Sequence, residues 1–315
     1  MKNDMLNGML GLVTGDALGS PVQFMSKEAI RRRGRIEEME PCPGFGMPAG
    51  AWTDDSSMAL AALASQKEKG CIDLQDIMVR LEGWLYHNEY TSCGVTFDVG
   101  YTCATAIQNF TRGKSPEKCG LTGEYANGNG ALMRILPTCI FCARLERQGT
   151  LTEAEAVAAV ESVAALTHNH HRTNMACGLY YFMTRKLMET EGELPQLLRE
   201  ALDEGFAFYD QRDGDREPEL NPLRDLDTLA ARPENSIPDS GYVVHTLLAA
   251  VWGLLNSDSY RSALLKVVNL GEDTDTVGAV CGGLAGLYYG KDAIPEAWLR
   301  EVRRLSWIEE LCAEN

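Results

Sequence analysis

The sequence predicts an all-α fold, a compact array of about a dozen helices around one core. Apolar residues recur at helical spacing along most of the chain, and the alternation typical of a β-strand is nearly absent. The breaks between apolar stretches are short, and none has the composition of a linker. We therefore expect one domain over residues 1–315, long enough to bury a sizeable core.

The first predicted helix covers residues 5–19 and carries Gly11, Gly15 and Gly19 on one face. A face without side chains allows another backbone to approach closely. Asp16 lies in the same, otherwise apolar segment. Because a buried acid needs a partner, Asp16 is expected to support functional groups beside it.

Polar caps mark where several later helices begin. Asp73 is the predicted cap of a helix that runs to about residue 89, and Ser257 of one that precedes an acidic stretch. Thr152 and Glu155 have the spacing of a capping box, which predicts a helix ending near residue 168. Pro137 is expected to kink the helix that contains it.

The remaining helical patterns and two loops complete the predicted organisation. Further helices are predicted over residues 56–69, 98–112, 173–191 and 195–208. The loop at residues 41–50 is rich in proline and glycine and is a candidate flap over a site. The polar stretch at residues 210–239 is a candidate edge of a substrate cleft.

Charge and cysteine content narrow the classes of function. The formal net charge of −16 argues against a nucleic-acid partner and against an anionic membrane surface, which both require basic residues. No signal peptide or membrane-spanning pattern is present, so a cytoplasmic location is expected. The ten cysteines are scattered and are expected to be reduced, and the Cys139–Cys142 pair is expected to pack in the core.

An acidic stretch near the C-terminus is the first sign of a site. Asp273 and Asp275 are flanked by threonines and followed by an apolar, glycine-rich helical run in which glycines 278, 282 and 286 share one face. Carboxylates are favoured at a helix N-terminus, and aspartate and threonine are also ordinary cap residues. This stretch alone therefore fits a helix cap as well as a ligand set.

A second stretch of the same kind favours the ligand set. Thr53, Asp54 and Asp55 also precede a helix, more than two hundred residues earlier. If the two stretches meet, they offer oxygen donors only, which suits Mg²⁺ or Mn²⁺ rather than zinc. Four carboxylates packed together repel one another strongly, and a pair of divalent cations is the usual solution. The predicted metal ligands are Thr53, Asp54, Asp55, Asp273, Asp275 and Thr276.

Three further segments are candidate walls of a pocket. Asn129 and Gly130 precede a helix and are expected to present free N–H groups that suit an anion, although an Asn-Gly pair is also a common turn. His168 is expected to form hydrogen bonds, because no nearby carboxylate or cysteine completes a zinc set with its neighbours. Tyr242 fits a core position or a stacking surface.

Taken in order, these motifs resemble those of the ADP-ribosylglycohydrolase family, which includes the dinitrogenase reductase-activating glycohydrolases. The resemblance spans residues 5–290, and its strength comes from the order of six motifs that are each weak. The motifs are Gly15-Asp16-Ala17-Leu18-Gly19, Trp52-Thr53-Asp54-Asp55, Gly128-Asn129-Gly130 with Met133-Arg134, Thr167-His168, Ser240-Gly241-Tyr242-Val243-Val244, and Glu272-Asp273-Thr274-Asp275-Thr276.

The resemblance implies an all-α orthogonal fold with two divalent cations, Mg²⁺ or Mn²⁺, that releases ADP-ribose from ADP-ribosylated proteins or small-molecule acceptors. Carried over by residue, the six predicted oxygen donors are the metal ligands. The residues implied to hold ADP-ribose are Gln23, Asn129, Gly130, Met133, Arg134, His168, Gly241 and Tyr242.

One position departs from the family pattern. Many members have a catalytic glutamate where this chain has Gln23, and a glutamine cannot act as a base. Asp54, Asp55 or Glu124 would then supply the base. The departure also keeps open a non-catalytic protein that binds ADP-ribose, and the ligand set alone would permit a metal phosphohydrolase.

Overall fold

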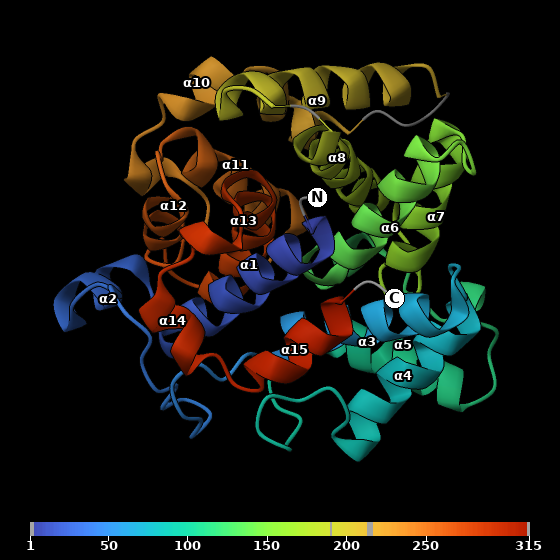
Figure 1. The fold of residues 1–315 in the computed structure, drawn as a ribbon, viewed down its shortest axis with the longest axis horizontal. Helices are drawn as coiled ribbons and strands as arrows, with labels where there is room; N and C mark the ends of the chain where they lie inside the picture. The colour runs from blue at the N-terminus through green and yellow to red at the C-terminus, as the bar shows by residue number, and fades with distance from the viewer. Residues whose placement is uncertain (1–2, 190, 213–216, 314–315) are drawn as a thin grey trace.

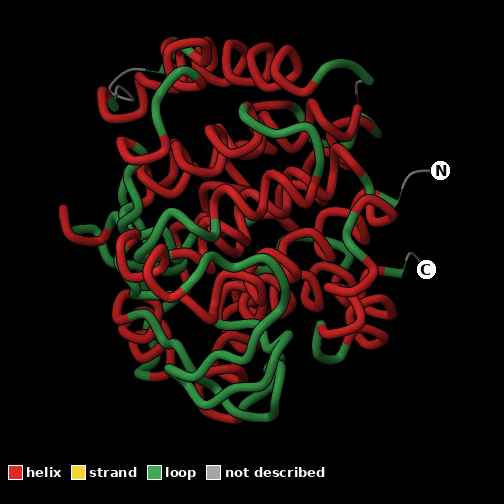
Figure 2. Tube along the Cα trace, turned by 90° about the vertical axis from the view of Figure 1, so that its left-hand side faces the viewer, coloured by secondary structure: helices red, strands yellow, loops and turns green. Residues whose placement is uncertain are grey.

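The computed structural model describes residues 3–189, 191–212 and 217–313, which form helices, turns and loops with no β-strand among them (Figure 2). The all-α prediction is therefore confirmed. The α-helices are α1 (Asp4–Gly19), α2 (Lys27–Arg33), α3 (Asp54–Lys69), α4 (Leu74–His87), α5 (Tyr101–Thr111), α6 (Leu136–Arg147), α7 (Glu153–Ala165), α8 (His171–Glu189), α9 (Leu194–Asp210), α10 (Leu226–Ala230), α11 (Val243–Leu255), α12 (Tyr260–Val267), α13 (Thr274–Tyr289), α14 (Glu296–Glu301) and α15 (Leu305–Cys312).

Helices α1 and α13 lie side by side at the centre, surrounded by the other helices (Figure 1). The predicted glycine faces of the two helices meet each other. A Cβ atom on Gly15 would lie 2.0 Å from the Gly278 carbonyl oxygen, and one on Gly11 would lie 2.2 Å from that of Gly282. Because no side chain fits between the backbones, this close pairing fixes the start of α13 against the end of α1.

Most predicted helix starts are confirmed, and three details are corrected. Asp73 caps α4, and Thr152 forms the predicted capping box of α7. The cap of α12 is Ser259 and not Ser257. Pro137 lies in the first turn of α6, where a proline lacks no intrahelical bond and causes no kink. Helix α5 begins after Gly100 and not at residue 98.

No described residue of the two candidate loops lines the cavity described below. The loop at residues 41–50 does not line the pocket described below, so a flap is not supported. Its Gly50 packs against the Glu301 carbonyl instead. The stretch at residues 210–239 contains α10 and two short 3₁₀ segments, and residues 213–216 lie outside the described structure. Its Asp239 carbonyl accepts a hydrogen bond from the Asp273 N–H.

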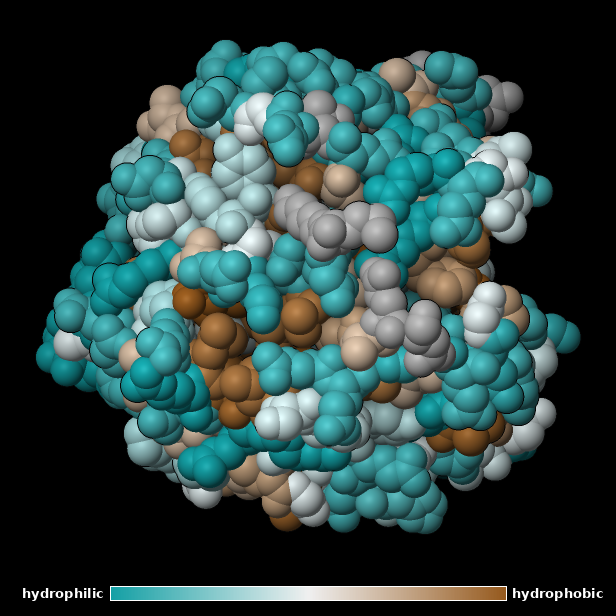
Figure 3. All heavy atoms as spheres, in the orientation of Figure 1, coloured by the Kyte–Doolittle hydropathy of each residue, from teal (hydrophilic) through white to brown (hydrophobic). Residues whose placement is uncertain are grey.

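Figure 3 shows a face that is mostly hydrophilic, with apolar side chains gathered near its middle. No helix in the described part of the chain is long and apolar enough to cross a membrane. All ten cysteines are free, and Cys139 and Cys142 are buried in the core as expected.

Candidate active site

The two acidic stretches converge at the N-termini of α3 and α13. Thr53 and Asp273 occupy the N-cap positions, but neither side chain makes a capping hydrogen bond. Capping therefore does not explain these residues. The side chains turn toward each other, and Thr53, Asp54, Asp55, Asp275 and Thr276 are all buried.

The Thr53 hydroxyl joins the two stretches. Its Oγ1 lies 3.0 Å from Asp55 Oδ2 and 3.4 Å from Asp275 Oδ2, across more than two hundred residues of sequence. The same oxygen lies 3.0 Å from Asp16 Oδ1. The hydroxyl has one proton and can donate it to only one of the three carboxylates, so it leaves the negative charge of the other two uncompensated.

Asp16 supports the start of α3, as its apolar sequence setting predicts. Its carboxylate accepts hydrogen bonds from the N–H groups of Thr53 and Ser56 and from the Ser56 hydroxyl. Burial is the main cause that raises the pKa of Asp16 to about 7. Two N–H groups at the start of α3, those of Thr53 and Ser56, are thus satisfied from α1, and the Asp54 and Asp55 side chains are left available for the site.

The carboxylates in this cluster are under-compensated. Asp55 Oδ1 and Asp275 Oδ1 are buried without a hydrogen-bond partner in the described structure. Burial, followed by repulsion between neighbouring carboxylates, raises the pKa of Asp54, Asp55 and Asp275 well above the ordinary value. Buried carboxylates with unpartnered oxygens need cations, and a donor set of oxygens alone fits hard divalent cations such as Mg²⁺ or Mn²⁺.

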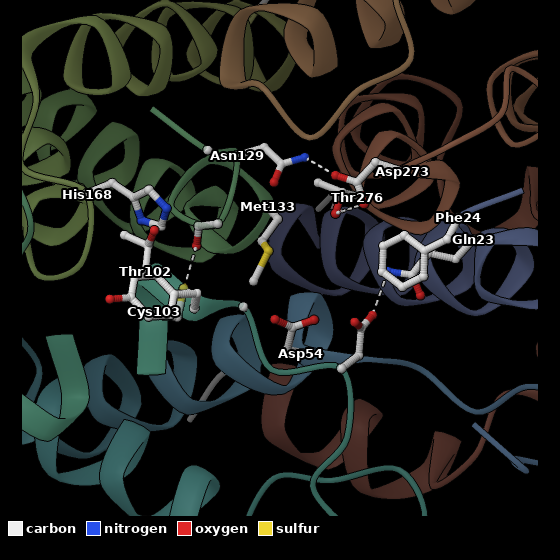
Figure 4. A pocket seen from close by; sticks show the side chains of 15 residues that line it. Gln23, Phe24, Asp54, Thr102, Cys103, Asn129, Met133, His168, Asp273 and Thr276 are labelled. Atoms are coloured by element: carbon white, nitrogen blue, oxygen red, sulfur yellow. Dashed lines mark hydrogen bonds between the residues drawn. The ribbon is translucent and has the colours of Figure 1, made fainter. Parts of the chain in front are cut away.

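A cavity of about 220 Å³ opens beside the cluster (Figure 4). Figure 4 shows His168, Thr102 and Cys103 at one end of it and Gln23 and Phe24 at the other, with Asp54 and Met133 between. The lining residues are Gln23, Phe24, Asp54, Asp98, Gly100, Tyr101, Thr102, Cys103, Gly128, Asn129, Gly130, Met133, His168, Asp273 and Thr276.

Asp98 is a site residue that the sequence analysis missed. It lines the cavity, and its Oδ2 accepts a hydrogen bond of 2.7 Å from Gln23 Nε2. Burial is the main cause that raises the pKa of Asp98, and the bond from Gln23 opposes it. In the sequence, Asp98 looked like the start of a helix, but its φ of 55° places it in a left-handed turn before α5. No local pattern in the sequence marks that turn.

The loop that contains Asn129 and Gly130 faces the cluster. The Asn129 side chain donates hydrogen bonds to Asp273 Oδ2 and to the Thr246 hydroxyl. The sequence analysis expected a free Asn129 N–H, and this expectation is wrong, because the N–H donates to the Gly241 carbonyl. Gly130 is needed for space, since a Cβ there would lie 2.9 Å from both Cys103 Sγ and His168 Cε1.

His168 lines the cavity, whereas Arg134 stands behind it and forms no part of the wall. Arg134 is fully buried and donates to the Thr167 hydroxyl at 2.8 Å. Thr167 Oγ1 also lies 2.8 Å from His168 Nδ1, so this hydroxyl links the Arg134 guanidinium to the imidazole. Burial, with the charge of Arg134 as the second cause, lowers the pKa of His168 to about 3.

Glu124 and Tyr242 lie outside the cavity lining. The Glu124 side chain is 65% exposed and forms an ion pair with Arg172, so its position does not support the role of base. Tyr242 packs against His245 and faces the Arg172 guanidinium. Gly241 lies closer to the site, because a Cβ there would come 3.0 Å from Asp273 Oδ2.

His170 and His171 lie close to the carboxylate of Glu217, which is distant from them in the sequence. Ligand atoms of His170, His171 and Glu217 lie within 4.8 Å of one another. Both Glu217 oxygens are engaged, one by His171 and the other by Arg172. The Arg172 guanidinium therefore already neutralises the negative charge of Glu217 that would otherwise attract a metal ion.

Comparison with solved structures places this helical fold in a known class of protein. A solved structure described as an ADP-ribosylglycohydrolase-related protein complex matches with a TM-score of 0.77 and 29% identity, covering 98% of this chain and 95% of that one. A model of the ADP-ribosylglycohydrolase family matches residues 2–314. The chain belongs to the ADP-ribosylglycohydrolase family, as its motifs suggested.

Several curated relatives share nearly the whole chain. An ADP-ribosyl-[dinitrogen reductase] glycohydrolase of Rhodospirillum rubrum is 31% identical, covering 95% of this chain and 92% of its own. The ADP-ribosylarginine hydrolase Tri1 of Pseudomonas putida is 30% identical, covering 97% of this chain and 76% of its own. That of Serratia proteamaculans is 28% identical, covering 97% and 77% respectively.

Proposed function

We propose that this protein is a metal-dependent hydrolase that releases ADP-ribose from ADP-ribosylated acceptors by cleaving the glycosidic bond at the distal ribose. The observation that carries the proposal is the buried cluster of carboxylates with unpartnered oxygens beside a cavity. A protein that used this fold only as a scaffold would have no need for such a repulsive group. Relatives named for hydrolysis of ADP-ribosylarginine and ADP-ribosyl-dinitrogen reductase support the same reaction class.

The residues that would hold two divalent cations are the six predicted oxygen donors. When bound, the cations would supply positive charge that orients the ribose hydroxyls and makes a nearby water more acidic. Asn129 would hold the Asp273 carboxylate in position through its side-chain amide. Asp16 would hold Thr53 and the first turn of α3 in position.

Asp98 is the preferred candidate for the base that takes a proton from the attacking water. It lines the cavity next to Asp54, and its raised pKa brings it nearer to neutrality, where a general base is most effective. Gln23 cannot take up the proton itself, but its amide donates to Asp98 and orients that carboxylate. Negative charge from Asp54 and Asp98 would also stabilise an oxocarbenium-like transition state.

The charges support a placement in which the two ends of the cavity hold different parts of the substrate. At the His168 end, a neutral imidazole lines the cavity in front of the buried Arg134 guanidinium. No carboxylate pairs with that guanidinium in the described part of the chain, so the end favours an anion. The diphosphate would lie there, which directs the scissile bond toward Asp54 and Asp98.

A non-catalytic protein that binds ADP-ribose is the second candidate, and Gln23 in place of the family glutamate is the feature that favours it. The two functions are separated by release of free ADP-ribose from arginine-linked and serine-linked ADP-ribosylated protein, with Mg²⁺, with Mn²⁺ and with a chelator. We expect release that the chelator stops and that Asp275→Asn lacks. Tight ADP-ribose binding without release from either substrate would favour the binding protein.

A further inference from the structure

Phe24 is a bulky apolar residue in an unusual setting. Its side chain is 64% exposed although it lines the cavity. Its φ of 63° lies in the left-handed region, which a residue with a large side chain rarely adopts. An exposed aromatic ring on a strained backbone gains nothing from core packing, and such strain is characteristic of functional positions.

Two backbone hydrogen bonds hold this conformation. The Phe24 N–H donates to the Glu272 carbonyl at 2.7 Å, and the Glu272 N–H donates to the Met25 carbonyl at 2.8 Å. Glu272 also has a left-handed φ, of 53°, and it directly precedes Asp273. The Phe24 backbone is therefore fixed relative to the acidic cluster, and the ring starts from a defined position beside it.

The position of Phe24 separates it from the end that suits the diphosphate. Figure 4 shows Phe24 and Gln23 on the opposite side of Asp54 from His168. Asp98, bonded to Gln23, gives this end a carboxylate, which repels phosphate and attracts a cation. An aromatic face beside a carboxylate suits a planar cation such as a guanidinium.

We propose that Phe24 contacts the acceptor side chain, so that this residue contributes to choosing which linkage is cleaved. The inference rests on the proposed function, because it takes the cleaved bond to lie between the diphosphate end and Phe24. A guanidinium acceptor would stack on the Phe24 ring while its charge faces Asp98. A serine-linked acceptor has no cation and gains less from either group.

Phe24→Gly is the sharpest variant, because glycine adopts a positive φ without strain and removes only the ring. Phe24→Ala removes the ring but keeps the backbone strained, and Phe24→Tyr keeps an aromatic face. His168→Gln is the matched contrast at the other end of the cavity. Thermal melting should place Phe24→Gly at or above the parent protein in stability.

The test compares two affinities by calorimetry with Mg²⁺ present. An arginine-linked ADP-ribosyl peptide is measured on an Asp55→Asn background, which slows turnover and keeps the Asp98 carboxylate beside Phe24, and free ADP-ribose is measured on the same proteins. We expect Phe24→Gly and Phe24→Ala to weaken binding of the arginine-linked peptide about five- to tenfold. The affinity for free ADP-ribose should stay unchanged. Phe24→Tyr should bind the arginine-linked peptide about as tightly as the protein with Phe24. Loss of the ring should weaken binding of a serine-linked peptide less. His168→Gln should weaken binding of free ADP-ribose.

Two results would overturn the proposal. Equal weakening of peptide and free ADP-ribose in Phe24→Gly would place the ring against the ADP-ribose itself, and no change in either would remove Phe24 from recognition. Failure of the parent protein to release ADP-ribose would instead overturn the proposed hydrolase, because the peptide affinity is measured without turnover.

Discussion

The starts of α3 and α7 look alike in the sequence and differ completely in the structure. In α7, Thr152 accepts a hydrogen bond from the Glu155 N–H and Glu155 accepts one from the Thr152 N–H. In α3, Thr53 makes no capping bond, and Asp55 faces other carboxylates. The hydrogen bond from the Thr152 backbone lowers the pKa of Glu155, whereas burial raises that of Asp55 well above its ordinary value.

The difference shows that a threonine followed by acids marks a helix start but not its purpose. The start of α7 is exposed, so its acid finds its partners in its own backbone and in water. The start of α3 is buried, and α1 supplies the acceptor for its N–H groups through Asp16. Once another helix satisfies the backbone, the acids of α3 have no local role and repel one another.

The largest effect is expected when a charge is removed from the buried start of α3. Asp55→Asn should lower turnover at least about a thousandfold and weaken Mg²⁺ and Mn²⁺ binding, because a neutral amide holds a divalent cation poorly. The matched change Glu155→Gln, at the exposed start of α7, should leave both unchanged. Steady-state release of ADP-ribose and metal titration by calorimetry measure the two quantities. Full activity in a variant that binds no metal would refute the proposed metal centre.

A smaller loss is expected at Asp98. Asp98→Asn should reduce kcat about a hundredfold while metal affinity stays close to that of the parent, since proton transfer contributes roughly this factor and Asp98 is not a predicted ligand. The pH profile of kcat should lose its acidic limb in the variant. If Asp98→Asn instead loses metal binding along with kcat, Asp98 is a ligand and not the base.

The carboxyl groups at the buried start of α3, together with Asp16, should also determine how the stability of the fold depends on pH. The folded protein without metal keeps protons on carboxyl groups whose pKa is raised, while the unfolded chain has released them. Its stability should therefore fall as pH rises from about 4, and for Asp16 the fall extends from the ordinary value of 3.8 to about 7. Excess Mg²⁺ or Mn²⁺ should raise the melting temperature most at neutral pH. Melting curves at several pH values, with metal and with chelator, test this, and a rise in stability between pH 4 and 7 without metal would contradict it.

The smallest expected effect belongs to the exposed cap. Thr152→Ala should lower the free energy of unfolding by about 1 kcal/mol, the usual cost of losing an N-cap side chain, and leave turnover unchanged. Denaturant titration together with the ADP-ribose release assay measures both. A change in turnover would mean that α7 transmits strain to Thr167 and His168, which follow its end.

The sequence predicted more of the fold than of the cavity, for a local reason. Helical periodicity, the capping box at Thr152 and the glycine face on α1 depend on residues within a few turns of one another, and these predictions are confirmed. The predicted start of α5 at residue 98 and the predicted cap at Ser257 are each wrong by two to three residues. At α12, two serines two residues apart compete for the role of cap. The repeated threonine-aspartate stretches also indicated correctly which segments would meet.

Tertiary structure alone decided what individual side chains do. Arg134 and His168 both looked like pocket residues, but only packing showed that the arginine lies behind the histidine and is linked to it through Thr167. Glu124 lies outside the cavity lining, while Asp98 lines the cavity from a left-handed turn with no sequence signal. Direction, burial and the partner across the cavity depend on segments far apart in the chain, and local patterns carry no information about them.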